Sequence, residues 1–446
     1  MQCKTERDLA SNELMAKIQA RQAHVVVIGA GYVGVPLAVE LAEAGVKVTA
    51  YDKDPRKVDL LNAGESYIED IPSTQLRSCV STGLLSGANE AHCLREADVV
   101  LVCVPTPLTR SKEPDLSYVE AAISDVVAHQ HPGMLVVLES TTYPGTTREV
   151  VVPLLTERFE LGEDVFVAFS PERVDPGNKV YQTRNTPKVV GGASPACQKV
   201  ATALYGHVVD RVVPVSSTDA AEMVKLVENT FRAVNVGLVN ELAQVSRALR
   251  VDIAEVIDAA ATKPFGFMPF YPGPGLGGHC IPIDPLYLAW KLRTLNHESR
   301  FVALADQVNS GMPRHVARRA MELMSAHGKA LRGARVLVAG VAYKRDISDV
   351  RESPAIDVIR ELTQSGARVE FVDPHVREIN EHGVALRGVP EGHVDYGDYD
   401  LVVVTTNHSS FDYEEIARRA RLVLDTRSTV PGRRAGEDWD HNVAVL

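Results

Sequence analysis

The stretch VVVIGAGYVGVPLAVELAEAGVKVTAYD, residues 25–52, decides the fold of the N-terminal part of the chain. A β-branched run typical of a buried strand leads into a helical pattern and then into a second strand-like run. Between the first strand and the helix, Gly29, Gly31 and Gly34 are spaced as GxGxxG. Such glycines allow a tight turn, close approach of the backbone to a pyrophosphate and close helix packing, and the helix N-terminus offers amide donors. The stretch therefore predicts a Rossmann-type unit that binds a dinucleotide.

An acidic residue ends the second strand of this stretch. Asp52 lies about 20 residues beyond the glycines, where a carboxylate can accept hydrogen bonds from the ribose hydroxyls. This position favours NAD over NADP, because an adenosine 2′-phosphate would meet a negative charge. The neighbouring Arg56 and Lys57 favour the opposite choice, since a basic side chain can bind that phosphate. The alternative, that the glycines merely end a strand, is disfavoured by the strand before them and the helix after them.

Strand-like runs alternate with helical patterns over much of the chain. ADVVLVCV, MLVVLES and DVFVAFS continue a parallel sheet, which we assign to an NAD-binding Rossmann domain over residues 24–215, after a polar extension, residues 1–23. Long helical stretches fill residues 216–328, and the helix expected over residues 218–249 suits a domain connector or dimer seam. RVLVAG, RVEFVD, DLVVVTT and RLVLD predict a smaller domain over residues 329–446. The predicted fold class is α/β, with two Rossmann-like doubly wound domains joined by a central all-helical region.

The second Rossmann-like region differs from the first at its phosphate turn. It has one glycine where a dinucleotide fingerprint needs three, so we expect it to hold a mononucleotide or nothing. Its basic residues Lys344, Arg345 and Arg351 suit a phosphate or carboxylate, and solvated surface charge is the alternative.

An irregular segment, KPFGFMPFYPGPGLGGHCIPIDP, interrupts the helical region at residues 263–285. Its glycines and prolines cannot continue a helix, and its aromatic residues favour an ordered, functional loop. Cys280 follows a glycine-rich approach and precedes Asp284 by one helical turn. Free cysteines are mostly small buried hydrophobes, and Cys103, in an apolar strand, is interpreted in that way. The remaining cysteines, in unremarkable segments, are Cys3, Cys79, Cys93 and Cys197.

A thiol beside a nicotinamide has a specific chemical use. It adds to an aldehyde to give a thiohemiacetal, which can surrender a second hydride and leave a thioester for water to hydrolyse. Cys280 therefore predicts oxidation of an alcohol to an acid, with two NAD consumed per substrate. His279 has no second ligand at useful spacing, so we treat it as structural and expect no metal.

Four polar residues are further candidates. Lys225 and Asn229 share one face of the long helix, although an exposed polar stripe is the common alternative. Thr141 and Glu172 follow strands of the parallel sheet, and ligands bind at the carboxyl ends of such strands.

Composition bounds the function classes. The 446 residues are 45% hydrophobic, enough for two or three domains, and the net charge of -11 argues against a nucleic-acid-binding surface. No apolar run is long enough for a signal peptide or a membrane span, so we expect a cytoplasmic protein. The six cysteines show no paired spacing, which favours free thiols.

Several motifs together resemble the UDP-glucose and GDP-mannose dehydrogenase family over nearly the whole chain: GAGYVG, VPTP, SPER, EMVKLVENTFRAVNVGLVNEL, GPGLGGHC and DVRESPA. The resemblance implies a UDP-sugar substrate, Cys280 as nucleophile, and Lys225 with Asn229 as stabilisers of oxyanions. Asp284 with Thr141 would orient water or assist proton transfer, and Glu172 would serve in thioester hydrolysis. Implied cofactor contacts are Gly29, Gly31, Tyr32, Val33, Gly34, Asp52, Lys57, Thr106, Thr141 and Arg351. Implied substrate contacts are Glu172, Arg173, Lys225, Asn229, Tyr271, Gly273, Gly275, Gly277, Tyr343, Lys344 and Arg427.

Within that family, FYPGPGLGGHCIPIDP and PERVDPG are similar to the UDP-N-acetylglucosamine 6-dehydrogenases. The UDP-glucose branch commonly has Glu where this chain has Pro176, and Lys where it has Ile283. UDP-N-acetylmannosamine and UDP-N-acetylgalactosamine stay open as substrates, because these sugars differ in features that no motif reports.

Two other classes compete with this interpretation. A one-step dehydrogenase of the hydroxyacid or phosphogluconate type would need neither Cys280 nor the C-terminal domain. An NAD-responsive regulator is disfavoured by the intact cysteine, lysine, asparagine and aspartate set.

The long helix also predicts a homo-oligomer, a dimer at least. Its apolar residues need more cover than two flanking domains offer, and family members commonly pair through this segment. These residues are Met223, Leu226, Val227, Phe231, Val234 and Leu238.

Overall fold

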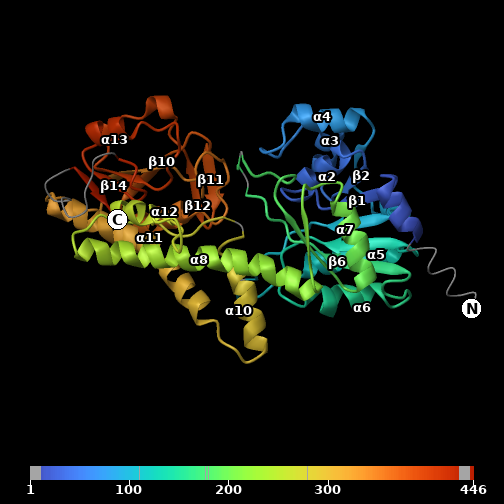
Figure 1. Cartoon of the computed structure of the whole chain (residues 1–446). Coiled ribbons are helices and arrows are strands. Elements are labelled where there is room, and N and C mark those ends of the chain that lie inside the picture. The colour runs from blue at the N-terminus through green and yellow to red at the C-terminus, as the bar shows by residue number, and fades with distance from the viewer. Residues whose placement is uncertain (1–11, 110, 176, 179, 279, 431–441) are drawn as a thin grey trace, which may run out of the picture. The chain divides into compact units, whose positions relative to one another are not determined.

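The structure is a computed structural model of the whole chain (Figure 1), and it describes residues 12–109, 111–175, 177–178, 180–278, 280–430 and 442–446. Two compact units emerge from the contacts within the chain. Unit 1 comprises Met1–Glu228 with Leu286–Asn296, and unit 2 comprises Asn229–Pro285 with His297–Leu446. Helix α8 (Thr218–Ala248) contributes its first part to unit 1 and the rest to unit 2.

Unit 1 is built on an eight-stranded sheet of order β3-β2-β1-β4-β5-β6-β7-β8. The five strands that the sequence predicted are present, and they pair in parallel. β7, which was not predicted from the sequence, runs antiparallel to β6. The bounds are β1 (His24–Ile28), β2 (Lys47–Tyr51), β3 (Leu85–Ala88), β4 (Val99–Val102), β5 (Met134–Leu138), β6 (Val165–Phe169), β7 (Lys188–Gly192) and β8 (Val212–Val215).

Alternate residues of these strands enter two separate cores, one on each face of the sheet. Val25 and Val27 of β1 pack with one core, and Val26 and Ile28 pack with the other. The first core takes residues of α2 (Gly34–Glu43), α3 (Pro55–Ala63), α4 (Ser73–Ser81) and α7 (Pro195–Tyr205). The second takes residues of α5 (Ser117–His129) and α6 (Val152–Leu155). Helices therefore cover both faces, as in a doubly wound fold.

Residues 12–19, within the segment expected to be a polar extension, form a helix. Leu14 and Ile18 of this helix are buried in the first core. Unit 1 also contains a 3₁₀ helix (Ala91–Glu96), a π-helical turn (Thr147–Val151) and α10 (Asp284–Thr294), most of which belongs to this unit.

Unit 2 contains a smaller, fully parallel sheet of order β10-β9-β13-β14-β15. Its strands are β9 (Arg335–Ala339), β10 (Arg368–Val372), β13 (Leu401–Val404), β14 (Val423–Asp425) and β15 (Val443–Val445), and β11 (Glu378–Glu381) pairs with β12 (Val384–Arg387) as a hairpin. Its helices are α9 (Ile253–Ala261), α11 (Arg300–Ala326), α12 (Pro354–Gln364) and α13 (Tyr413–Arg419), with 3₁₀ turns at Glu391–His393 and Tyr396–Asp398. The predicted α/β class with two Rossmann-like sheets and a long central helix is confirmed.

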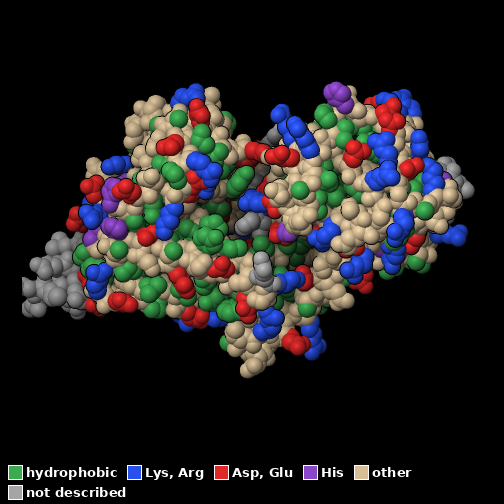
Figure 2. Space-filling model, turned by 180° about the vertical axis from the view of Figure 1, so that it is seen from behind, with side chains coloured by type: hydrophobic (Ala, Val, Ile, Leu, Met, Phe, Trp, Pro, Cys, Tyr) green, Lys and Arg blue, Asp and Glu red, His purple; other side chains and the backbone are tan. Residues whose placement is uncertain are grey.

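Basic and acidic side chains are interspersed over the face that Figure 2 shows. None of the helices in the described part of the chain combines the length and apolar character that crossing a membrane requires.

Candidate active site

The three glycines after β1 have three different surroundings. Gly29 has a φ of +101°, and a Cβ there would lie 2.5 Å from the carbonyl oxygen of Cys103. A Cβ on Gly34 would collide with the carbonyl of Gly29, whereas a Cβ on Gly31 would meet nothing within 4 Å. Two glycines are thus required by internal packing. The third leaves open space at the turn, which is what a pyrophosphate approaching the backbone needs.

Asp52 is held at the end of β2 by the same turn. Its Oδ2 accepts from the backbone amide of Ala30 at 2.9 Å, and its Oδ1 accepts from the amide of Asp54 at 2.9 Å. Lys57 Nζ lies 3.1 Å from Asp52 Oδ2, and Arg56 is paired with Asp54 at 2.9 Å. Both cations that favoured NADP in the sequence are therefore already paired with carboxylates.

Asp52→Asn is expected to lower kcat/KM for NAD by about 10-fold or more, because hydrogen bonds to a charged group are worth about 1.5–3 kcal/mol. The ratio of kcat/KM values for NAD and NADP measures this effect. Arg56→Ala, a change at an exposed cation on the same turn, should leave the ratio nearly unchanged. A wild-type protein that used NADP as well as NAD would contradict the role of Asp52.

The remaining cofactor candidates of unit 1 lie in turns or at helix starts. Tyr32 is exposed, Val33 directly precedes the first residue of α2, and Thr141 lies in the loop after β5. Thr106 is buried after β4, and its carbonyl accepts from the hydroxyl of Tyr287 on α10 at 3.0 Å.

Two carboxylates on α8 flank Lys225 and hold the loops that carry Thr141 and Glu172. Glu222, fully buried, accepts from the amides of Gly145 and Thr147 at 2.6 and 2.8 Å. Burial raises the pKa of Glu222 to about 7, although these donors act in the other direction. Glu228 binds the guanidinium of Arg173, with Nε 2.9 Å and Nη2 2.5 Å from Oε1. Since Glu222 and Glu228 lie three residues on either side of Lys225, α8 fixes both loops next to that lysine.

Arg173 is thus engaged inside unit 1. Besides Glu228, it donates through Nη1 to the carbonyl of Pro187 at 2.7 Å. Its neighbour Glu172 accepts through Oε1 from the amides of Arg173 and Val174 at 2.7 and 2.8 Å, and Lys188 Nζ lies 3.1 Å from Oε2. Burial acts to raise the pKa of Glu172, but Lys188 and the two amides outweigh it and lower that pKa below its usual value. Glu172 is therefore a carboxylate at neutral pH.

In unit 2 the structure brings Asn229 and Asp284 together. The side-chain amide of Asn229 donates to Asp284 Oδ2 at 2.5 Å, and Asp284 is 3% exposed at the start of α10. Cys280 is exposed, and its carbonyl accepts from the amides of Ile283 and Asp284 at 3.1 and 2.8 Å. This turn ties the cysteine to the helix that presents the aspartate. The buried state of Cys103 agrees with its interpretation as a core residue.

The glycines of the cysteine loop pack against the predicted nucleotide-side residues of unit 2. A Cβ on Gly273 would collide with the guanidinium of Arg427, and one on Gly277 would lie 2.9 Å from Tyr343 Cβ. Gly275 has a φ of +142°, and its Cβ would lie 3.0 Å from Pro354. The loop can approach these residues only because it lacks side chains at these positions.

Arg427 itself is anchored through Nε, which donates to the carbonyl of Thr405 at 2.9 Å. Burial lowers the pKa of Arg427 to about 10, although Asp425 opposes this shift. Tyr271 is turned toward α9, where its hydroxyl donates to Asp258 at 2.6 Å. Lys344 is half-buried beside Tyr343, and Arg351 pairs with Asp349 at 2.6 Å.

Arg427→Ala is expected to weaken UDP binding by about 10-fold to 100-fold while leaving NAD binding nearly unchanged, because a charged hydrogen bond is worth about 1.5–3 kcal/mol. Calorimetric titration with UDP and with NAD measures both affinities. Arg421→Ala, at an exposed arginine on the same unit, is the matched control. Equal loss of both ligands would contradict a specific role for Arg427 in UDP binding.

Near the turn after β9, groups of the protein itself occupy the hydrogen-bonding sites of Asp373. Asp373 Oδ2 accepts from the amide of Val341 at 2.6 Å and from His408 Nε2 at 3.0 Å, and Asp373 Oδ1 accepts from the amides of His375 and Val376. A carboxylate with so many internal donors has no capacity left for a ribose. The geometry thus agrees with the absence of a dinucleotide fingerprint from this domain.

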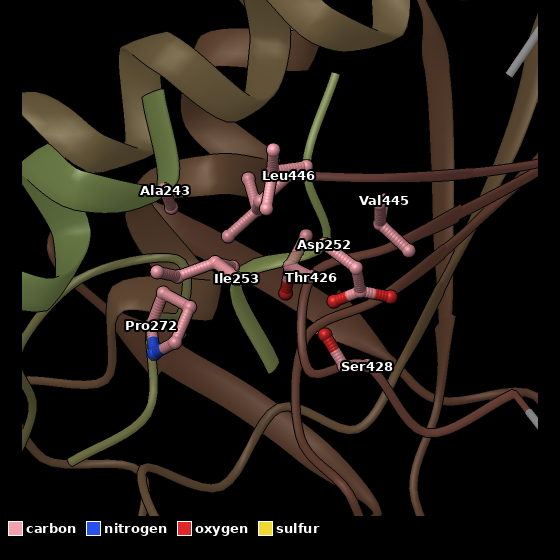
Figure 3. A pocket seen from close by; sticks show the side chains of 9 residues that line it. Ala243, Asp252, Ile253, Pro272, Thr426, Ser428, Val445 and Leu446 are labelled. Carbon is pink, nitrogen blue, oxygen red and sulfur yellow. The ribbon is translucent and has the colours of Figure 1, made fainter. Parts of the chain in front are cut away.

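Asp346, His375 and His408 place potential ligand atoms within 4.8 Å of one another. His408 Nδ1 accepts from the amide of Asp346 at 3.0 Å, while its Nε2 faces Asp373. Because both ring nitrogens are engaged, His408 has no lone pair to give a metal ion. A small pocket elsewhere in unit 2 is lined by Asp252, Pro272, Thr426 and Ser428, among others (Figure 3). It has room for little more than a water molecule.

Sequence reasoning missed several buried polar residues that support the site. Asn240 Oδ1 accepts from the amide of Gly273 at 2.9 Å, and its Nδ2 donates to Asn309 on α11 at 2.9 Å. Glu222 and Lys188 are the others. Each lies close to other polar residues in its stretch of sequence (NTPKVV, DAAEMVK and LVNELAQ), so no local signal distinguishes it. Cys3, Pro176 and His279 lie outside the described residues.

Comparison with known proteins identifies the class of protein. Three family models match: the UDP-glucose/GDP-mannose dehydrogenase NAD binding domain at residues 23–209, the central domain at 219–311 and the UDP binding domain at 337–432. The chain is an NAD-dependent nucleotide-sugar dehydrogenase and belongs to the UDP-glucose/GDP-mannose dehydrogenase family.

Its relatives act on different amino sugars. The chain is 33% identical to a UDP-N-acetyl-D-glucosamine 6-dehydrogenase of Pseudomonas aeruginosa, over 87% of this chain and 91% of that one. It is also 33% identical to an NDP-N-acetyl-D-galactosaminuronic acid dehydrogenase of Ralstonia nicotianae, over 92% and 97%. Among solved structures, a UDP-D-ManNAc dehydrogenase from Pyrococcus horikoshii is similar with a TM-score of 0.85 and 32% identity, over 95% of this chain and 99% of that one.

Proposed function

We propose that this UDP-sugar 6-dehydrogenase oxidises the primary alcohol of UDP-N-acetylglucosamine to the uronic acid. The observation that carries the chemistry is the turn that joins an exposed Cys280 to the buried Asp284, which accepts a hydrogen bond from the half-buried Asn229. Three observations support UDP-N-acetylglucosamine as the substrate. The sequence of the loop around Cys280 is similar to that of UDP-N-acetylglucosamine 6-dehydrogenases, and Ile283 stands where the UDP-glucose branch commonly has lysine. The Pseudomonas relative carries the name of that activity.

Different residues of the chain act in successive steps of the reaction. Gly29, Gly31, Gly34 and Asp52 would hold NAD, and each of two NAD molecules bound in turn would accept one hydride. Asp284, oriented by Asn229, assists removal of the hydroxyl proton as the first hydride leaves C6. The Cys280 thiolate then adds to the aldehyde carbon, the carbonyl π bond breaks and its oxygen takes up a proton. The resulting thiohemiacetal loses that proton and the second hydride to become a thioester. Lys225 and Asn229 stabilise the oxyanions.

Hydrolysis completes the reaction. A water oxygen attacks the thioester carbon, the carbon–sulfur bond breaks, and Cys280 is regenerated as a thiolate. Glu172 accepts a proton from the attacking water and passes it on, so that a carboxylate and a free cysteine result. Arg427, Tyr343 and Lys344 bind the uridine diphosphate, and the glycine loop lines the sugar.

A panel of nucleotide sugars tests the substrate assignment. Purified protein with NAD is mixed with UDP-N-acetylglucosamine, UDP-N-acetylmannosamine, UDP-N-acetylgalactosamine or UDP-glucose, and NADH absorbance is followed. We expect the highest kcat/KM for UDP-N-acetylglucosamine. A higher value for an epimer or for UDP-glucose would transfer the assignment to that sugar.

We further propose that the protein is a dimer at least. On unit 2, Phe231, Leu238, Leu242 and Val245 of α8 are exposed, as are Phe301 and Leu304 of α11. Exposed apolar side chains along one helix stripe are normally covered by a partner, and a second copy presents the same stripe. The surface and the family resemblance together favour pairing through this segment.

Leu238→Glu together with Leu242→Glu is expected to give a monomer, because each copy would place charges in the shared stripe. Sedimentation at micromolar concentration measures the mass of wild type and variant. Arg250→Glu, at an exposed residue beyond the end of α8, is the control. A wild-type protein that sediments as a monomer would contradict the dimer.

A further inference from the structure

Lys188 is a buried lysine with two carboxylate partners, and it takes part in none of the proposed steps of the reaction. It lies on β7 and is 3% exposed. Its Nζ is 2.6 Å from Glu139 Oε2 and 3.1 Å from Glu172 Oε2, and the hydroxyl of Tyr205 donates to the other oxygen of Glu139. Burying an ammonium costs free energy unless it is paired and hydrogen-bonded. The two carboxylates supply this pairing for Lys188, and Tyr205 in turn holds Glu139.

The two carboxylates differ in their access to solvent. The Glu139 side chain is 0% exposed, whereas that of Glu172 is 17% exposed. Glu139 follows β5, two residues before Thr141, and Glu172 follows β6, at the strand ends where ligands bind in such sheets. Lys188 thus links a closed internal carboxylate to an accessible one.

The donors around Glu172 also fix its orientation. A carboxylate offers about four lone-pair sites. Two backbone amides occupy Oε1, and Lys188 occupies one site on Oε2. The remaining site on Oε2 is therefore the one that a water molecule can reach.

We infer that Lys188, held by Glu139 and Tyr205, is a positioning residue for thioester hydrolysis: it keeps Glu172 ionised and directs its free lone pair at the attacking water. The inference rests on the proposed function, in which Glu172 accepts the proton of that water. The water oxygen bonds to the thioester carbon, the carbon–sulfur bond breaks toward Cys280, and the proton passes through Glu172 to solvent.

The charges support the geometry. Burial acts to lower the pKa of Lys188, but the two carboxylates outweigh it and raise that pKa above its usual value. Lys188 in turn contributes to the lowered pKa of Glu172. A folded-state pKa below the unfolded value means that Glu172 stays ionised until the pH falls below its usual range. Without the ammonium, one of the groups that lower the pKa of Glu172 is lost, so the carboxylate takes up a proton at higher pH.

Lys188→Met tests the role with a readout that a purely structural lysine would not move. In single turnovers of the full-length protein with NAD and UDP-N-acetylglucosamine, we expect the NADH burst to persist and acid release to slow by about 10-fold to 100-fold. The thioester on Cys280 should then accumulate and be detectable by mass spectrometry. In the pH profile of the rate at which the uronic acid is released, the low-pH, or acid, limb should move to higher pH.

Three further variants make the test specific. Lys188→Gln keeps a hydrogen-bond donor without the charge and should show the same pH shift if Lys188→Met does not fold. Lys188→Arg restores the charge and should return the acid limb toward the wild-type position. Lys199→Met, at an exposed lysine of α7, should change nothing.

An unchanged rate of acid release and an unchanged acid limb in folded Lys188→Met or Lys188→Gln would overturn the inference about Lys188. A wild-type protein that makes no acid from any UDP-sugar would instead overturn the proposed function.

Discussion

Cys280→Ala is expected to form no uronic acid while remaining folded and able to bind NAD and the UDP-sugar. Without the sulfur no thiohemiacetal can form, so the second hydride has no covalent adduct from which to leave. Because Cys280 is exposed, truncation should change the free energy of unfolding by no more than about 0.5 kcal/mol. Acid formation is measured by chromatography, and ligand binding by calorimetry.

Cys93→Ala is the matched control, since Cys93 is a half-buried thiol of unit 1 and should leave turnover unchanged. Cys280→Ser is informative in a different way, because a hydroxyl can form an ester slowly and trap an intermediate detectable by mass. Acid formation by Cys280→Ala at a near wild-type rate would rule out covalent catalysis by this residue. Hydrated aldehyde would then be the species that gives up the second hydride.

Asp284→Asn is expected to lower kcat by roughly 10²-fold to 10⁴-fold, the usual contribution of a positioned acid–base group. The variant keeps the shape of the side chain and an oxygen that can accept from Asn229, but it cannot take up a proton. The fold should survive, because the amide can still occupy the buried position at the start of α10. Steady-state kinetics with saturating NAD and UDP-sugar measure the loss.

Asp59→Asn, at an exposed aspartate of α3, controls for a general effect of removing a carboxylate. Binding of the UDP-sugar to Asp284→Asn should stay within a few-fold of wild type, so that the loss falls on kcat and not on KM. A variant with wild-type kcat would show that Asp284 has no part in proton transfer, and its hydrogen bond with Asn229 would then be structural.

The sequence was sufficient to predict elements whose signal is local. The run VVVIG with its glycines predicted β1, the turn and α2, and the helical pattern over residues 218–249 predicted α8, which the structure places at Thr218–Ala248. The Gly- and Pro-rich loop around Cys280 was recognisable because these residues break helices.

The direction of a strand within the sheet was harder to predict from the sequence. β7 has the short sequence KVVGG and runs antiparallel to β6, a feature that depends on the path of the connecting chain and not on the residues of the strand. The strands β3, β7, β8, β11, β12 and β15 were not predicted, since their short sequences give too little periodicity.

The supporting contacts of the site could not be predicted, because their partners are far apart in the chain. Lys188 and Glu139 are separated by 49 residues, Gly145 and Glu222 by 77, and Asn229 and Asp284 by 55. The resemblance supplied residue names for part of this set. It gave no reason to single out Lys188, Glu222 or Asn240, whose importance lies in being buried and paired.

The number of NADH molecules formed for each UDP-sugar consumed tests the central claim most directly. A limiting amount of UDP-N-acetylglucosamine is converted to completion with excess NAD, and NADH absorbance and residual sugar nucleotide are measured on the same sample. Covalent four-electron oxidation through Cys280 predicts two NADH per sugar and a carboxylate product. One NADH per sugar with an aldehyde product would contradict it.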